Sequence, residues 1–421
     1  LKAVSSSLAT ILVHGGVDGG AGVPLIGDLS LVVAFAMAAF AVLFGTRHTD
    51  ATEHQQGLML AVAAESIVKL VAFLAVGIFV CFWMFDGPTA LFGEATMHRA
   101  SAAVLNREPA LSTLATMTLL SFLAILLLPR QFHVAIVEAQ SDREIRRAAW
   151  MFPLYLVLIN LFVVPIALAG LVRLPAGEVD SDMFVLALPL AAHSDMLTLV
   201  AFVGGLSAAT AMVIVETVAL AIMVSNDIVM PLVLKRREAV ANGSADIGAG
   251  LLLRVRRFAI FAILALAYAY YRSAGEAQLA AIGLLSFAAI AQLAPAFFIG
   301  LVWRRATARG AIAGMVAGGL AWAYTLMLPS VADAGLFSHE LVTHGPLGIA
   351  MLRPQALFGV DLPPLVHGVV WSLSLNLLAY VSFSLARAPA SIERVQASAF
   401  VPSDLAPTTP SFRLWRTSVA N

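Results

Sequence analysis

Apolar runs of membrane-spanning length recur along the whole chain, and they constrain its fold more than any other feature. A bilayer core about 30 Å thick is crossed by about 20 apolar helical residues. Of the 421 residues, 60% are hydrophobic and only 12% are charged, whereas a soluble domain carries about 25% charged residues. Because lipid offers no hydrogen bonds to exposed backbone groups, the sequence predicts an all-α, polytopic membrane protein.

Charged or Pro/Gly-rich breaks divide the chain into a partial first span and nine complete spans. A bilayer-spanning domain is predicted over 1–390, followed by a cytoplasmic linker over 391–421. The partial span covers about 3–13, and the complete spans cover about 29–45, 57–84, 111–128, 150–171, 196–224, 257–271, 277–302, 310–328 and 365–386.

The basic residues fall on two sides of this threading very unequally. Alternating the spans across the membrane places eighteen of the 25 Lys and Arg residues on one side and five on the other. Basic loops are retained in the cytoplasm. The pattern therefore predicts a multi-pass protein whose C-terminus is cytoplasmic.

The sequence carries few signs of the functions typical of soluble proteins, such as nucleic-acid binding, metal binding or catalysis. The formal net charge is zero, so no global field favours nucleic acid. Cys81 is the single cysteine, and the histidines lack metal-ligand spacing. No nucleotide-binding, zinc-protease or hydrolase motif is present. We expect no catalytic residue, no metal and no cofactor in this chain.

Glu216 stands alone in the apolar run GGLSAATAMVIVETVALAIMVSNDIVMP, residues 204–231. It precedes the polar edge at Asn226 by ten residues, about 15 Å of helix, which places it near the midplane. An acidic residue there costs about 2.5–3.5 kcal/mol. A proton-binding role is one reading, since burial favours the neutral acid, and a hydrogen-bonded glutamate that joins two helices is the other.

Hydroxyl residues accompany this glutamate along the same helix. Ser207, Thr210 and Thr217 recur at spacings of three and seven and so share one face, with Glu216 at its edge. They are candidates for coupling-ion contacts together with Glu216. Small and hydroxyl residues at this spacing are equally typical of helix packing in membranes.

A second pair of charges lies within the span 57–84. Glu65 and Lys69 are four residues apart and can meet on one helical face. Pairing would lower the cost of placing either charge in the bilayer, so we interpret them as a structural intramembrane pair.

Polar interruptions elsewhere suggest solute contacts. Thr113, Thr116 and Ser121 precede the helix-breaking LPRQFHV, and Gln292 lies shortly before a second proline within a span. Broken helices form solute sites in transporters. Ordinary helix ends and packing are the alternative.

Both ends of the chain suggest a longer protein. The opening LKAVSSSLATILVHGG has no signal-peptide pattern. The end, SFRLWRTSVAN, mixes basic and apolar residues as if a further helix were beginning. We therefore expect truncation at both ends.

Several stretches resemble the sodium:solute symporter family over about residues 1–390. They include LSFAAIAQLAPAFFIGLVWRRATARGAIAGMVAGGL and IMVSNDIVMPLVL. More narrowly, LPRQFHVAIVE, AATAMVIVETVAL and HGVVWSLSLNLLAYV resemble the symporter-like membrane module of CbrA-type bacterial sensor histidine kinases. The resemblance implies a leucine-transporter-type fold of inverted repeats that lacks its first three helices, in a bacterial inner membrane.

The resemblance also implies an ion site that this chain alters. The family's adjacent hydroxyl residues on sodium fall here on Ala211 and Met212, with only Thr210 beside them. Because sodium needs several oxygen ligands, proton coupling through Glu216 becomes the favoured reading, with sodium as its alternative.

Three functions follow as hypotheses. The first is a transport and sensing module for a small solute, an amino acid such as histidine by resemblance, which feeds a downstream kinase domain and its response regulator. The second is a stand-alone sodium:solute symporter. The third is a receptor that keeps the symporter fold without transport.

Overall fold

The computed structural model describes residues 1–14, 28–45, 56–137, 139, 141–174, 179–233, 249–273, 278–333 and 340–400. Within these ranges all regular structure is helical. The linker predicted over 391–421 is described only as α19 (Ser391–Phe400), and its remainder lies outside the described residues. The helices of eleven or more residues are α1 (Lys2–His14), α2 (Leu29–Gly45), α3 (Gln56–Phe79), α6 (Leu111–Leu127), α8 (Asp142–Asn160), α9 (Val163–Arg173), α11 (Asp195–Met223), α13 (Ala249–Ser273), α14 (Leu279–Ile290), α15 (Ala308–Trp322) and α18 (Pro364–Leu385).

Seven of the nine predicted spans meet the length and hydropathy of a membrane crossing. Six do so as single helical stretches: Leu60–Met84, Asp142–Arg173, Asp195–Val233, Leu279–Ile299, Ala308–Asp333 and Pro364–Leu385. A seventh is the bent pair Leu111–Leu127 and Pro129–Ile136. The prediction of an all-α, multi-pass membrane protein is thereby confirmed.

Two predicted spans are helices that fall short of that standard. α2 is only 17 residues long, which is about 26 Å at 1.5 Å per residue. α13 carries Arg254, Arg256 and Arg257 in its first turns, so its apolar part is short. The predicted spans 29–45 and 257–271 are therefore helical but do not meet this length and hydropathy criterion within the described residues.

One apolar helix was not predicted. Before the span 196–224, Ser181–Ala191 forms a short apolar helix, composed of one 3₁₀ turn and α10 (Phe184–Ala191). Asp180 caps its start, because its carboxylate accepts a hydrogen bond from the Asp182 N–H at 3.0 Å. The apolar residues that follow then pack into the core.

The proline-bearing breaks lie where the sequence placed them. α6 ends at Leu127, and Leu128 adopts an extended conformation (φ −63°, ψ 128°) before Pro129, as the residue before a proline prefers. The chain then turns by 51° into α7 (Pro129–Phe132). The span 277–302 is likewise interrupted, by a 3₁₀ turn over Ala291–Leu293 and a π-helix over Pro295–Ile299.

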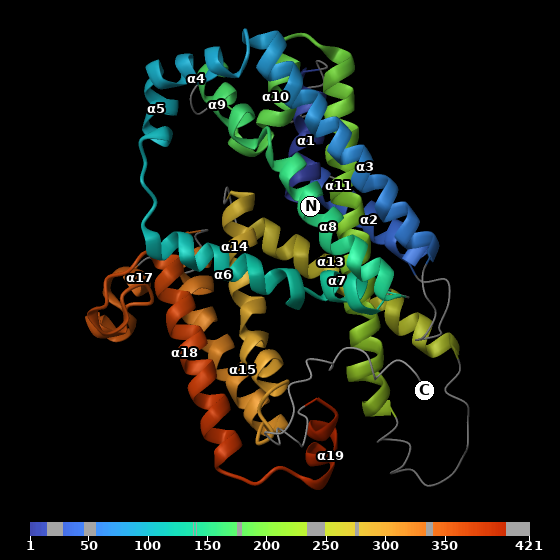
Figure 1. Ribbon diagram of the computed structural model, residues 1–421, viewed down its shortest axis with the longest axis vertical. Coiled ribbons are helices and arrows are strands. Elements are labelled where there is room, and N and C mark those ends of the chain that lie inside the picture. Colours follow the sequence, from blue (N-terminus) through green and yellow to red (C-terminus); the bar gives the residue numbers. More distant parts are fainter. Residues whose placement is uncertain are drawn as a thin grey trace, which may run out of the picture.

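α15 and α18 lie side by side at the lower left of Figure 1 and form the tightest helix pair. Gly310, Gly314 and Gly318 are all buried along one face of α15. Their spacing of four is the small-residue pattern that lets helix backbones approach in membranes. Asn376 and Tyr380 of α18 occupy the space that a Cβ at Gly314 would need.

α11 is the central helix of the other part of the bundle and runs the length of that part in Figure 1. It packs against α1, α2, α3, α10 and α13. In Figure 1 the lower part of the view holds the C-terminal ends of α11 and α18 and the start of α15. The upper left holds α4 (Pro88–Met97) and α5 (Arg99–Leu105).

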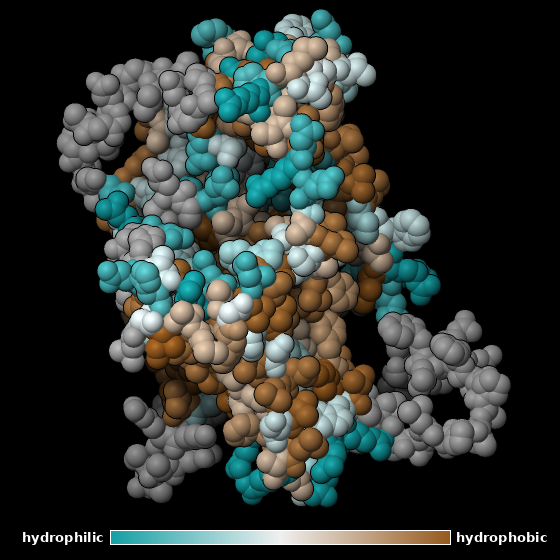
Figure 2. Space-filling model, turned by 90° about the vertical axis from the view of Figure 1, so that its left-hand side faces the viewer, coloured by the Kyte–Doolittle hydropathy of each residue, from teal (hydrophilic) through white to brown (hydrophobic). Residues whose placement is uncertain are grey.

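Hydrophobic side chains cover much of the outer surface. On the face seen in Figure 2 they gather in the lower half, bordered by hydrophilic residues at the bottom edge. Leu378 and Phe383 of α18 are 64% and 58% exposed, and Phe122 of α6 is 56% exposed. An apolar surface of this extent is suited to contact with lipid tails.

A polar clamp joins the start of α2 to the end of α13. The Asp28 carboxylate accepts hydrogen bonds from the Tyr268 hydroxyl at 2.5 Å and from the Ser30 N–H at 2.9 Å. The Arg272 guanidinium lies 3.6 Å from the same carboxylate. The Tyr268 hydrogen bond, with the Ser30 bond and the Arg272 charge, holds the pKa of Asp28 below its usual value despite some desolvation.

We expect Asp28→Asn to reduce the thermal stability of the protein at neutral pH but not at strongly acidic pH. A carboxylate whose folded-state pKa is depressed stabilises the fold above its unfolded pKa of about 4, and that contribution is lost as pH falls through the folded pKa. The thermal midpoint of the wild type in detergent should therefore exceed that of the variant at pH 7 and approach it below about pH 3. An equal gap at both pH values would contradict the clamp.

Candidate functional site

Glu216 lies on α11 among tightly packed neighbours. Val215, Thr217 and Val218 are each less than 5% exposed, whereas the Glu216 side chain is only partly buried. The side chains next to it form an apolar cluster in which Ile214 and Val218 meet residues of α2 and α13. Glu216 itself is partly buried, in keeping with the cost of an acid that faces lipid alone.

Arg130 is the basic partner that acts on Glu216. The Pro129 break directs α7 against α11, and the Arg130 charge interacts electrostatically with Glu216 across that contact. The same guanidinium acts on Lys69 of α3. Arg130 is one of the eighteen basic residues on the predicted cytoplasmic side, and its separation of 86 positions from Glu216 gave no local sign of this interaction.

The hydroxyl residues of α11 bond mainly to their own helix. Thr210 donates to the Leu206 carbonyl at 2.9 Å, and Thr217 donates to the Val213 carbonyl at 2.6 Å. Their oxygen lone pairs stay available, so they and the partly buried Ser207 remain predicted coupling-ion contacts. Among the described residues no group of three or more His, Cys, Asp or Glu could hold a metal ion.

Glu65 and Lys69 interact through space on α3, but their charged groups do not form an ion pair within the described chain. The Lys69 ammonium instead lies 5.8 Å from the centre of the Tyr155 ring. Tyr155 of α8 is held in place because its hydroxyl donates to the Ser66 carbonyl at 3.3 Å. Lys69 thus contacts α8 in addition to its interaction with Glu65, and the structural role of this pair stays a prediction.

The predicted solute contacts on α6 are distributed around the helix. Thr116 is buried, Thr113 is partly buried and Ser121 is exposed. Leu120 and Leu123 pack the same helix against Ala288 and Ala291 in an apolar cluster. A role of Thr113, Thr116 and Ser121 in solute binding stays a prediction.

Gln292 occupies the centre of a buried hydrogen-bond network. Its Nε2 donates to the Ser372 hydroxyl at 3.0 Å and to the Ala288 carbonyl at 3.1 Å. Asn376 Nδ2 in turn donates to the Gln292 carbonyl at 2.7 Å and to Oε1 at 3.1 Å. The side chain therefore joins the broken span to α18, and a solute-binding role for it also stays a prediction.

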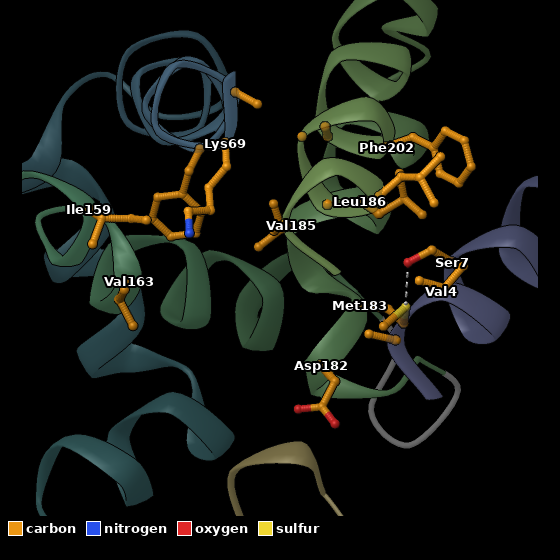
Figure 3. A pocket seen from close by; sticks show the side chains of 18 of the residues that line it. Val4, Ser7, Lys69, Ile159, Val163, Asp182, Met183, Val185, Leu186 and Phe202 are labelled. Atoms are coloured by element: carbon orange, nitrogen blue, oxygen red, sulfur yellow. Dashed lines mark hydrogen bonds between the residues drawn. The ribbon is translucent and has the colours of Figure 1, made fainter. Parts of the chain in front are cut away.

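A cavity of about 460 Å³ lies between α1, α3, the α8–α9 break, α10 and α11. None of the residues predicted to bind solute lines it, but Lys69 does. Figure 3 shows Lys69 extending from α3 into the space between Ile159 and Val185, with Asp182 at the opposite end. The residues that line this cavity come from segments far apart in the chain, so no local sequence pattern indicates it.

The fold and these sites define a multi-pass, all-helical membrane protein. It has a cavity between its helices, and charged residues lie on the neighbouring helices α3, α7 and α11. Comparison of the chain with models of protein families and with curated proteins finds no match. A more specific function for this protein therefore has to be inferred from the arrangement of Glu216, Arg130 and Lys69.

Proposed function

We propose that this chain is a solute-binding membrane module of symporter type, coupled to a cation through Glu216. The observation that supports it most is an acidic side chain in the central helix α11, partly buried and within the electrostatic field of Arg130. An intramembrane acid that interacts electrostatically with a base is expected in a proton relay. The two broken spans, at Pro129 and Gln292, are also features of transporters.

The proposed coupling ion is the proton. Protonation of Glu216 removes its attraction to Arg130, so α11 and α7 would differ in their interaction between the two states. Such a difference is what allows a ligand or proton to shift a conformational equilibrium. Sodium, bound by Thr210 and backbone carbonyls, is the competing ion.

The proposed setting is the sensory input of a bacterial histidine kinase, with a cytoplasmic C-terminus and an amino acid such as histidine as solute. The resemblance of LPRQFHVAIVE and AATAMVIVETVAL to such modules supports this setting. A stand-alone symporter and a receptor without transport are the alternatives.

Glu216→Gln in the full-length protein is expected to lower proton-driven histidine uptake into proteoliposomes by about tenfold or more, because the amide cannot exchange a proton. Uptake that remains should lose its pH dependence. Glu65→Gln is the matched control, since Glu65 is also a partly buried intramembrane acid but has no predicted coupling role.

Other outcomes distinguish the alternatives. Sodium-driven uptake that is indifferent to Glu216→Gln would favour the sodium site. Histidine-dependent autophosphorylation without uptake would favour the receptor. Uptake and pH dependence that are both unchanged in Glu216→Gln would refute the coupling role.

A further inference from the structure

The cavity beside α3 has an almost wholly apolar wall. Phe73, Ile159, Leu186 and Phe202 contribute from four different helices. Its volume of about 460 Å³ falls in the range of sites that enclose small organic ligands. Of the described residues that line it, Lys69 and Asp182 are the charged ones.

Asp182 is already compensated by groups of the protein. Its Oδ2 lies 3.8 Å from the Lys2 ammonium and accepts a hydrogen bond from the Leu279 N–H at 3.0 Å. Asp180 lies 3.6 Å from the same ammonium. This end of the cavity therefore has no unmet demand for a ligand cation.

Lys69 is in the opposite situation. Within the described chain its ammonium forms no ion pair, and its nearest specific contact is the Tyr155 ring. Arg130 adds a second positive charge to the surroundings of Lys69, and Glu65 on the same helix adds a negative one. A partly buried ammonium in apolar surroundings gains most from an anionic partner.

We propose that this cavity binds an apolar monocarboxylate, whose carboxylate pairs with Lys69 and whose hydrocarbon or aromatic body fills the space between α3, α10 and α11. This inference deepens the proposed function, because it names the class of solute. Binding of the ligand does not depend on the proposed function, whereas its transport or sensing does. The Lys69 ammonium in the wall, with the Arg130 charge acting on it from outside the cavity, disfavours an organic cation. An amino acid with a large apolar side chain is the zwitterionic member of the class.

Calorimetric titration of the full-length protein in lipid nanodiscs, with 4-phenylbutyrate as probe, tests the charge. Lys69→Met keeps the length and apolar character of the side chain but removes the ammonium. We expect its affinity for the probe to fall about 10- to 100-fold, the effect of losing a charge-assisted hydrogen bond. Lys69→Arg should retain most of the affinity, and 4-phenylbutylamine should bind neither form.

Gly205→Leu tests the space. Gly205 lines the cavity, and a Cβ there would meet no other atom within 4 Å. The leucine should therefore fill part of the site and weaken the probe at least about tenfold without lowering the thermal midpoint. Gly319→Leu is the matched control, because Gly319 of α15 has equally open surroundings but lies outside the cavity.

Equal affinity in the wild type and Lys69→Met would overturn the proposal, as would full binding in folded Gly205→Leu. Phenylalanine, titrated in parallel, shows whether a zwitterion is accepted. Because binding is measured without uptake or phosphorylation, loss of this site and failure of Glu216 coupling give separate results.

Discussion

Gly310→Leu is expected to lower the free energy of unfolding by about 3 kcal/mol, the upper end for an overpacked core. A Cβ at this position would lie 2.7 Å from the Tyr380 carbonyl oxygen and closer still to the Ser384 hydroxyl. The Ser384 side chain can rotate away, but the Tyr380 carbonyl is backbone, so α15 and α18 must separate for the leucine to fit. That separation removes van der Waals contact between α15 and α18, the most extensively packed helix pair in the described part of the chain.

A second effect follows at the start of α15. Ser384 accepts hydrogen bonds from the Thr307 N–H and from the Thr307 hydroxyl, each at 3.3 Å. Thr307 caps α15 by accepting from the Gly310 N–H at 3.1 Å. Displacing Ser384 therefore disturbs the cap as well as the helix contact.

Equilibrium unfolding in mixed micelles measures the loss, and Gly319→Leu on the same helix is the control. It should cost far less, because a Cβ at Gly319 meets nothing within 4 Å. Equal costs for the two variants would show that helix propensity, and not the close approach of α15 and α18, is responsible.

Asn376→Leu is expected to destabilise the fold by about 1–3 kcal/mol through the loss of a buried hydrogen-bond partner. Asn376 is 1% exposed, and its amide donates to both the carbonyl and the side-chain oxygen of Gln292. Leucine has a similar size but no donor. The Gln292 oxygens would then lie buried without their Asn376 partner.

A double-mutant cycle with Gln292→Leu isolates this interaction. Gln292→Leu removes Oε1, so the double variant leaves fewer stranded polar atoms than the sum of the single changes implies. We expect a coupling energy of about 0.5–3 kcal/mol from unfolding measurements. Strict additivity of the two substitutions would contradict the network.

The helices and their breaks were predictable because their causes are local. Apolar runs of spanning length specify helices in lipid, and the residue before Pro129 is sterically biased away from the helical conformation. Leu128 accordingly ends α6. α10 was not predicted, because its eight residues are too few for the spanning-length pattern on which the prediction relied.

The candidate site was predictable only in part. The depth of Glu216 follows from its distance along one helix, so the sequence identified it as a costly and informative residue. Its electrostatic partner Arg130 depends on how α7 packs against α11 after the bend. The expected pairing of Glu65 and Lys69 followed from helical spacing alone, and it did not anticipate Tyr155 on α8.

The sequence by itself determined the all-helical, membrane-spanning character of this protein, the two proline-marked breaks and the unusual acid in α11. Each of these depends on hydrophobicity or sterics within about one helix length. Only the tertiary structure decided that the Arg130 charge acts on Glu216, that Gln292 joins α18, and that Lys69 lines a cavity. These depend on side-chain packing between segments far apart in the chain, which no local pattern encodes.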